Sequence, residues 1–340
     1  MRCRIEQSSI APMPISENIT KRLRIPVIAA PMLAVSGPDL VIAACRNGVI
    51  GAFPTANAPT VEGLEHWLKQ IEAALSNTTE KDPAHSPAPF CPNLIIRRAD
   101  MVEQMRCLVR HKVEIVITSV GSPAAVIAPL HDIGASVFAD VATMRHAEKA
   151  IAAGVDGLIL LTAGAGGQTG WMNPLAFVRA VRAIYDGPIV MAGGIIDGHA
   201  LWTAQVLGCD LAYMGTKFIA TQESMAPEAY KRMLVEHSMD DVLLTRAFTG
   251  LDANMLKPSI VAAGLDPSNL PERITEEFAN ETFGARASQP GPRRWRDIWS
   301  AGHSVSGVGQ IQSAAELIER TVREYEEARN STAHLLSGKA

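Results

Sequence analysis

The sequence predicts an α/β protein: a closed (β/α)8 TIM barrel with a smaller helical insertion after the eighth strand. The first observation is that eight short apolar segments alternate with helix-like segments up to about residue 220. This alternation is typical of parallel strands joined by right-handed crossovers, and eight units in a row favour a closed barrel. The second is that no G-x-G-x-x-G motif follows the first strand, which disfavours the alternative, a doubly wound open sheet.

The predicted strands are short apolar runs bounded by Gly, Pro or Asn. Continuous apolar runs are expected where both faces of a parallel sheet are buried. The strands are expected at residues 25–30, 49–53, 90–96, 114–120, 136–141, 158–161, 188–192 and 210–214.

Helices are predicted between the strands from their start and stop signals. Pro38 and Pro174 suit the first helical position, and Thr60 and Thr143 suit the N-cap. The helices are expected at residues 38–46, 61–75, 100–111, 124–131, 144–153, 174–185 and 199–207. An irregular lead-in is expected at residues 1–22, and a polar, proline-rich loop at residues 76–89.

The remaining sequence divides into an insertion and a closing helix. Residues 221–310 break the strand–helix repeat and suggest a helical substrate or cap subdomain. Residues 311–329 predict an amphipathic helix on the outside of the barrel. The expected domains are therefore a barrel of residues 1–220 and 311–340 and a cap of residues 221–310.

Composition narrows the class of function. The chain has 340 residues, 47% hydrophobic and 19% charged, with a formal net charge of −4. These values predict a large core and, without a basic stripe, no nucleic-acid partner. No apolar run is long enough to cross a membrane, and the N-terminus lacks the apolar stretch of a signal peptide. A cytoplasmic location is therefore expected.

Cysteine and histidine spacing predicts neither disulfides nor a metal site. The five cysteines, including Cys3 and Cys107, are scattered and form no C-x-x-C pair. The nine histidines are also scattered, and none pairs with another at the spacing of metal ligands. Scattered cysteines fit a reducing compartment.

Glycine-rich loops follow three of the predicted strands. Residues 164–170 contain four glycines, Gly193–Gly194 follows the seventh strand, and Gly215–Thr216 follows the eighth. In a barrel these loops gather on one face, and those after strands seven and eight commonly hold a phosphate. Backbone N–H groups and the Thr216 hydroxyl suit an anion without a metal. The alternative is that each glycine serves only its own turn.

Five motifs make the chain resemble the nitronate monooxygenase (2-nitropropane dioxygenase) family, which also includes FMN-dependent enoyl-thioester reductases and NADH:quinone reductases. The matching motifs are Ala30-Pro31-Met32, Pro92-Asn93-Leu94, AGAGGQTG at residues 163–170, AGGIIDG at residues 192–198 and MGTKFIATQES at residues 214–224. Weaker matches are FTGLDANML at residues 248–256 and SAGHSVSGVGQ at residues 300–310.

The resemblance implies a barrel that holds FMN non-covalently at its strand ends. Ala30, Pro31, Met32 and Asn93 are then expected beside the isoalloxazine ring or the ribityl chain. The phosphate region is implied at Gly166, Gly167, Ala192, Gly193, Gly194, Gly215 and Thr216.

Two residues depart from the family pattern. Gln168 stands where the family usually has a histidine that acts as the base, and glutamine forms hydrogen bonds but takes no proton at neutral pH. Asp140 stands near the expected flavin where some members carry a lysine, and a carboxylate there would disfavour an anionic reduced flavin. Both departures bear on the family's usual nitronate chemistry.

Two further residues are candidates for the active site. His303 lies where the family often has glutamine, and we hypothesise that it reaches the flavin and replaces part of the missing histidine; the alternative is a surface or packing residue. Trp171 follows the glycine loop and either shapes the substrate pocket or belongs to the core.

The sequence leaves several functions open. The first is a flavin enzyme that oxidises an alkyl nitronate with O2, with Gln168 and His303 at the catalytic centre. The second is an FMN-dependent reductase or dehydrogenase that uses NAD(P)H on an enoyl thioester or a quinone. A flavin-binding protein without catalysis and a flavin-free phosphosugar enzyme are further alternatives. A small-molecule substrate is expected, and assembly as a homodimer is left open.

Overall fold

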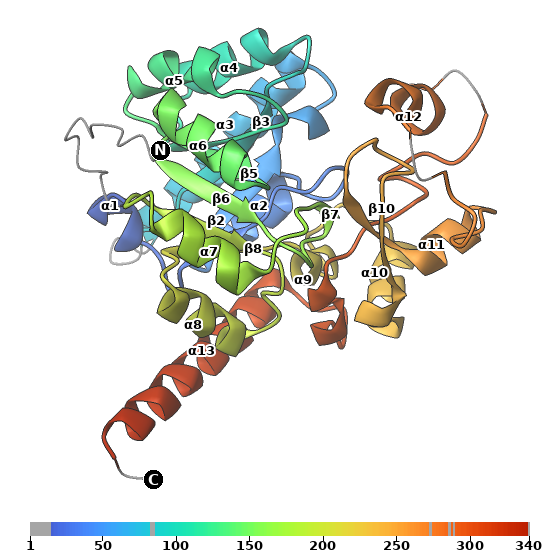
Figure 1. Cartoon of the computed structure of the whole chain (residues 1–340). Coiled ribbons are helices and arrows are strands. Elements are labelled where there is room, and N and C mark those ends of the chain that lie inside the picture. Colours follow the sequence, from blue (N-terminus) through green and yellow to red (C-terminus); the bar gives the residue numbers. More distant parts are fainter. Residues whose placement is uncertain (1–14, 82–85, 272–273, 285–286, 288–289, 339–340) are drawn as a thin grey trace, which may run out of the picture.

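Eight parallel strands close into the predicted barrel. The computed structural model describes residues 15–81, 86–271, 274–284, 287 and 290–338 (Figure 1), so Cys3 and most of the predicted lead-in lie outside the described residues. Strand β1 pairs with β9 to close the barrel. In order around it, the strands are β1 (Val27–Ala29), β2 (Ile50–Pro54), β3 (Phe90–Ile95), β4 (Ile115–Ser119), β5 (Ser136–Val141), β6 (Gly157–Leu161), β8 (Ile189–Ala192) and β9 (Leu211–Met214).

Alternate residues of the strands fill the barrel interior. Phe138 of β5 and Leu211 of β9 belong to this inner cluster, together with Cys91 of β3. Because side chains alternate along a strand, the residues two positions further on also point inward. These are Asn93, Asp140 and Tyr213, which lie nearer the carboxyl ends of their strands. Three polar side chains therefore lie at the end of the apolar barrel interior that is nearer the carboxyl ends of the strands.

Helices cover the outside of the barrel, with start signals as predicted. The Thr143 side chain accepts a hydrogen bond from the His146 N–H, and Asn173 caps the helix that begins at Pro174. The helices are α1 (Glu17–Thr20), α2 (Pro38–Arg46), α3 (Val61–Lys81), α4 (Met101–Arg110), α5 (Ala124–His131), α6 (Met144–Ala153), α7 (Pro174–Arg182) and α8 (Gly198–Leu207).

Helix α3 is longer than predicted. It continues to Lys81, so the loop expected at residues 76–89 is wrong for its first part, and residues 82–85 lie outside the described residues. Arg46 of α2 donates hydrogen bonds to the Thr78 hydroxyl and to the Ala74 carbonyl. These contacts with a neighbouring helix stabilise polar residues that have little helical preference of their own.

The sequence predicts a helical insertion, but the structure shows that the insertion also contains β-strands. Its strands β10 (Val242–Thr245) and β11 (Ala253–Leu256) are antiparallel, and β11 also pairs with β7 (Gly167–Gln168). The glycine loop after β6 thus contributes a strand to the insertion's sheet. Helix α9 (Thr216–Ile219) leads from β9 to the insertion, and helices α10 (Glu228–Glu236), α11 (Lys257–Ala262) and α12 (Glu276–Phe283) complete the insertion beside the barrel (Figure 1).

The C-terminal helix α13 (Ala314–Leu336) packs on the barrel exterior, as predicted, and runs along α8 (Figure 1). Ser313 and Glu316 form a capping box at its start, and the Trp202 indole donates to the Thr332 hydroxyl at 2.9 Å. Across the described ranges, no helix has the length and apolar character needed to cross a membrane.

Candidate active site

A cavity of about 550 Å³ opens at the carboxyl ends of the barrel strands. This volume is in the range of small-molecule and cofactor sites. Its wall includes Gln168 and all twelve residues that the sequence suggested for the cofactor: Ala30, Pro31, Met32, Asn93, Asp140, Gly166, Gly167, Ala192, Gly193, Gly194, Gly215 and Thr216. Loops separated by up to 186 positions thus meet at one cavity, which follows from the parallel barrel topology.

The ends of β8 and β9 present a group of free N–H donors. Among the described residues, no hydrogen-bond acceptor is found for the N–H groups of Gly193, Gly194, Gly215 and Thr216. The Thr216 hydroxyl accepts from the Gly302 N–H at 2.9 Å, which leaves its own proton to donate. Unpaired donors on a cavity wall fit an anionic group.

The glycines on this wall differ in the space around them. A Cβ atom at Gly193 would lie 2.6 Å from the Thr162 hydroxyl, and one at Gly166 would lie 2.7 Å from the Gly302 nitrogen. These two glycines are therefore required by the packing of the loops on one another. At Gly194, whose φ is +75°, no atom lies within 4 Å of an added Cβ. Gly194 is thus the position where the glycine backbone faces open space.

Asp140 and Tyr213 form the polar floor of the cavity. The Asp140 Oδ1 atom and the Tyr213 hydroxyl have no hydrogen-bond partner in the described structure. Burial raises the pKa of Asp140 to about 7, and burial together with the Asp140 charge raises that of Tyr213. Unpaired buried polar groups are costly, so their presence in a cavity wall indicates a polar ligand above them.

Substitution of Asp140 tests whether burial raises the pKa of this carboxyl group, because the raised pKa makes the stability of the fold depend on pH. The pKa of Asp140 in the folded chain, about 7, lies above the ordinary value of 3.8, so folding disfavours the ionised form of this carboxyl group. The resulting penalty is absent well below pH 4, grows between about pH 4 and 7, and is complete above pH 7. For Asp140→Asn, the gain in unfolding free energy of the cofactor-free chain should be about 2 kcal/mol larger at pH 8 than at pH 5. Urea unfolding at both pH values measures it, and an equal gain at both would contradict the argument.

Asn93 lies on the cavity wall, as its motif suggested, and its polar atoms also contact the protein. Its side chain is 5% exposed, and its Nδ2 atom donates to the Ser119 hydroxyl at 3.2 Å across the β3–β4 pair. The Thr55 hydroxyl donates to its backbone carbonyl at 3.1 Å. Asn93 therefore shapes the wall through protein contacts as well as facing the cavity.

The insertion supplies a second wall that sequence reasoning missed. Its members lie outside the five motifs that carry the family resemblance and include Thr249, Glu276, Asn280, Arg294, Trp295 and Ser300. Trp295 lies beside Gly167 and has a φ of +69°, a strained conformation for a bulky residue. The sequence signals for this wall were the two weaker family matches, which contain Thr249 and Ser300, and the position of the insertion after the last strand.

Three arginines lie on the cavity wall near the insertion. Arg97 pairs with Glu276 at 3.1 Å, and Arg98 pairs with Asp100 at 2.8 Å. Arg294 donates to the Phe248 carbonyl at 2.9 Å, and burial lowers its pKa. Glu276 and Asp100 offset two of these charges, so the three arginines leave an excess of one positive charge on this side of the cavity.

His303 and Trp171 lie outside the cavity wall, and the position of His303 fits the alternative of a surface or packing residue. His303 is exposed and is absent from the cavity wall; its N–H donates to the Gly164 carbonyl at 2.9 Å, and its ring lies beside Gly164. The structure therefore does not support the hypothesis that His303 replaces the missing histidine. Trp171 is 70% exposed, so it neither belongs to the core nor lines the cavity. In both cases the neighbouring motif predicts where the residue lies in the chain but not the direction in which its side chain points.

Comparison with known proteins agrees with this architecture. The chain is 28% identical to the nitronate monooxygenase of Paraburkholderia phytofirmans, over 89% of this chain and 93% of that protein. It is also 28% identical to the (3aS,4S,5R,7aS)-5-hydroxy-7a-methyl-1-oxo-octahydro-1H-indene-4-carboxyl-CoA dehydrogenase of Mycobacterium tuberculosis, over 69% of this chain and 64% of that protein. The structure of FabK from Thermotoga maritima has the same fold, with a TM-score of 0.78 at 23% identity, covering 94% of this chain and 99% of that chain.

The family model for nitronate monooxygenases matches residues 16–324. This range includes the barrel, the insertion and every loop that lines the cavity. The chain is therefore an enzyme of the nitronate monooxygenase family.

Proposed function

We propose that the chain binds FMN and oxidises an alkyl nitronate with O2. The observation that carries the proposal is the set of free N–H groups at Gly193, Gly194, Gly215 and Thr216 on the wall of the cavity. These donors and the Thr216 hydroxyl would hold the FMN phosphate. When bound, FMN supplies the acceptor for the electrons that leave the substrate.

The rest of the cavity offers groups that would suit a flavin ring. Ala30, Pro31 and Met32 would border the ring or the ribityl chain, and the apolar Met32 side chain suits a ring face. The unpaired Asp140 and Tyr213 groups offer polar contacts to the ring system from the barrel floor. These orphaned atoms and the free N–H donors are why the residues of this chain fit a phosphorylated flavin.

Gln168 suits a substrate that is already anionic. A nitronate has lost its α-proton, so the site needs no general base to form it. The Gln168 amide is held in β7 on the cavity wall, where its N–H2 group would donate to a nitronate oxygen. The surplus of arginine on the insertion side would attract the same anion.

A second function is an FMN-dependent reductase or dehydrogenase acting on an enoyl thioester or a quinone with NAD(P)H. Two observations favour it: the cavity extends under the insertion to Arg97, Arg98 and Arg294, and one relative is named a carboxyl-CoA dehydrogenase. The arginines would then bind the phosphates of a thioester arm or of a dinucleotide.

Substrate oxidation with and without reductant distinguishes the two functions. With the FMN-loaded protein in air, we expect nitronate and O2 to be consumed without NAD(P)H, with free FMN at the same concentration as the control. The reductase predicts the reverse: NADH or NADPH bleaches the flavin without O2, and an enoyl thioester or a quinone restores the colour. Nitronate turnover no faster than with free FMN would contradict the first proposal.

A further inference from the structure

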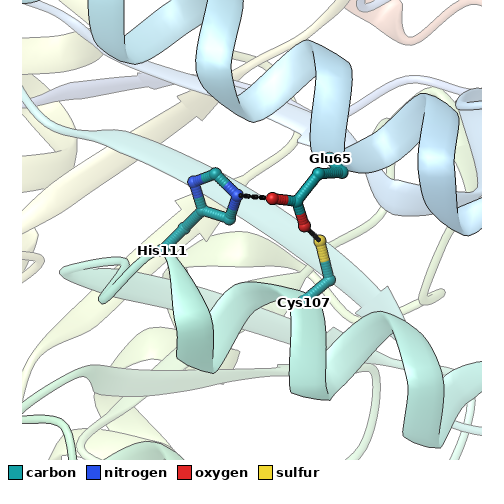
Figure 2. A group of neighbouring side chains, drawn as sticks. All are labelled: Glu65, Cys107 and His111. Atoms are coloured by element: carbon teal, nitrogen blue, oxygen red, sulfur yellow. Dashed lines mark hydrogen bonds and ion pairs between the residues drawn. The ribbon is translucent and has the colours of Figure 1, made fainter.

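A group of three different metal-ligand types lies between α3 and α4, outside the cavity. It consists of Glu65 of α3, Cys107 of α4 and His111, the residue that directly follows α4, and their side chains point toward one another in Figure 2. Their ligand atoms all lie within 4.8 Å of one another. None of the three lines the cavity at the strand ends.

The helix geometry explains why these residues meet. Cys107 and His111 are four residues apart at the end of α4, so they project from the same face. That face packs against α3 and carries the buried Leu108 nearby, while Glu65 reaches across from α3. Cys107 is fully buried, the His111 side chain is 8% exposed and that of Glu65 is 27% exposed. The three side chains thus form a mostly buried polar cluster that solvent reaches on the Glu65 side.

The distances are close to those between neighbouring ligands of one ion. The Glu65 Oε1 atom lies 3.0 Å from His111 Nε2, and the Glu65 Oε2 atom lies 3.3 Å from Cys107 Sγ. The other ring nitrogen, His111 Nδ1, lies 2.8 Å from a Glu72 carboxylate oxygen. A carboxylate on the far nitrogen is the usual partner of a metal-bound histidine, because it fixes the tautomer that leaves Nε2 free.

We propose that Glu65, Cys107 and His111 bind one zinc ion, with water as the fourth ligand. A thiolate, an imidazole and a carboxylate suit Zn²⁺, which takes four ligands in a tetrahedral arrangement, whereas Mg²⁺ and Ca²⁺ prefer oxygen ligands. The bound ion would join α3 to α4 and add to the stability of this side of the barrel.

Two features of the metal-free group must change when zinc binds. Burial raises the pKa of Cys107 to about 12, so its thiol proton must leave to solvent as the Zn–S bond forms. Arg110 and Lys69, which now contact the Glu65 carboxylate at 2.8 and 3.3 Å, must release an oxygen to the ion. Their side chains are 57% and 66% exposed, so both have room to move into solvent. Glu65 itself needs no proton loss, because Arg110, followed by His111 and Cys107, holds its pKa well below the usual range.

Cobalt spectroscopy of the untagged, FMN-loaded protein tests the site. Co²⁺ in a tetrahedral site with a thiolate gives strong ligand-field bands on the long-wavelength side of the flavin absorption, and six-coordinate Co²⁺ gives only weak ones. We expect one equivalent of Co²⁺ to produce the strong bands and Zn²⁺ to remove them. Cys107→Ser and His111→Ala should abolish them, and Glu72→Gln should weaken binding about 10–100-fold.

Matched controls keep the result specific. Cys209 is another buried free cysteine, away from this group, so Cys209→Ser should leave the bands unchanged. Saturating Zn²⁺ should raise the Tm of the parent chain and of Cys209→Ser but not that of Cys107→Ser. Weak bands only, or bands of full strength in Cys107→Ser, would overturn the proposal, provided that circular dichroism shows the variants folded. Neither result depends on the reaction at the flavin site.

Discussion

Gly194→Asp should lower the affinity of the chain for FMN by at least about 100-fold. The new side chain enters the space beside the free N–H groups, because no atom lies within 4 Å of an added Cβ. It brings a negative charge to the proposed phosphate position and competes for the same donors. Loss of two hydrogen bonds to a charged group, at about 1.5–3 kcal/mol each, corresponds to a factor of about 100 or more. Quenching of FMN fluorescence during titration of the cofactor-free protein measures it.

Gly264→Asp is the matched control. Gly264 has a φ of +78°, close to the +75° of Gly194, and also has no atom within 4 Å of an added Cβ. It is exposed in the insertion and does not line the cavity. Both variants therefore carry the same backbone strain and the same charge, and only Gly194→Asp should lose FMN. An equal loss in both would show that strain, and not the phosphate position, causes the effect.

Gly198→Ala should destabilise the fold by about 3 kcal/mol. Gly198 opens α8, and an added Cβ would lie 2.1 Å from the Tyr325 nitrogen of α13. The obstacle is the backbone of a second helix, so it is not relieved by a rotamer change, and the two helices must separate. Separation also lengthens the hydrogen bond from the Gly198 N–H to the Glu324 carboxylate, now 3.1 Å.

Thermal unfolding of Gly198→Ala and Gly309→Ala provides the comparison. Gly309 is exposed, has no atom within 4 Å of an added Cβ and does not have a positive φ. Its substitution by alanine should leave the Tm unchanged or slightly raised, because alanine restricts the unfolded chain. A Tm for Gly198→Ala within a degree of the parent would show that α8 and α13 do not pack as closely as the structure has them.

The barrel was predictable because its signals are local and repeated. Each strand is a short apolar run in a parallel sheet that is buried on both faces. The barrel loops that line the cavity directly follow these strands. Topology alone therefore brings Met32, Asn93 and Gly194 to one face, whatever the details of packing. Even the closure of the barrel by β1 and β9 follows from the number of repeats.

The parts that the sequence did not predict depend on contacts between distant residues. Strand β7 has two residues, too few to show a pattern, and it exists because β11 pairs with it. Cys107 and His111 are four positions apart, but Glu65 is 42 positions from Cys107, so the sequence does not show that the three residues form a group. The direction of His303 is set by its backbone bond to Gly164 and by the close packing of the two loops. Motifs locate such residues in the chain, but only the fold shows which of them face the cavity.

The central claim is that the free N–H groups at the ends of β8 and β9 bind the phosphate of a flavin. Parallel titrations of the cofactor-free protein with FMN and with riboflavin, which has the same ring and no phosphate, test it most directly. We predict that FMN binds at least about 100-fold more tightly than riboflavin, as expected for loss of several charged hydrogen bonds. Equal affinities, or no binding of either flavin, would contradict the account.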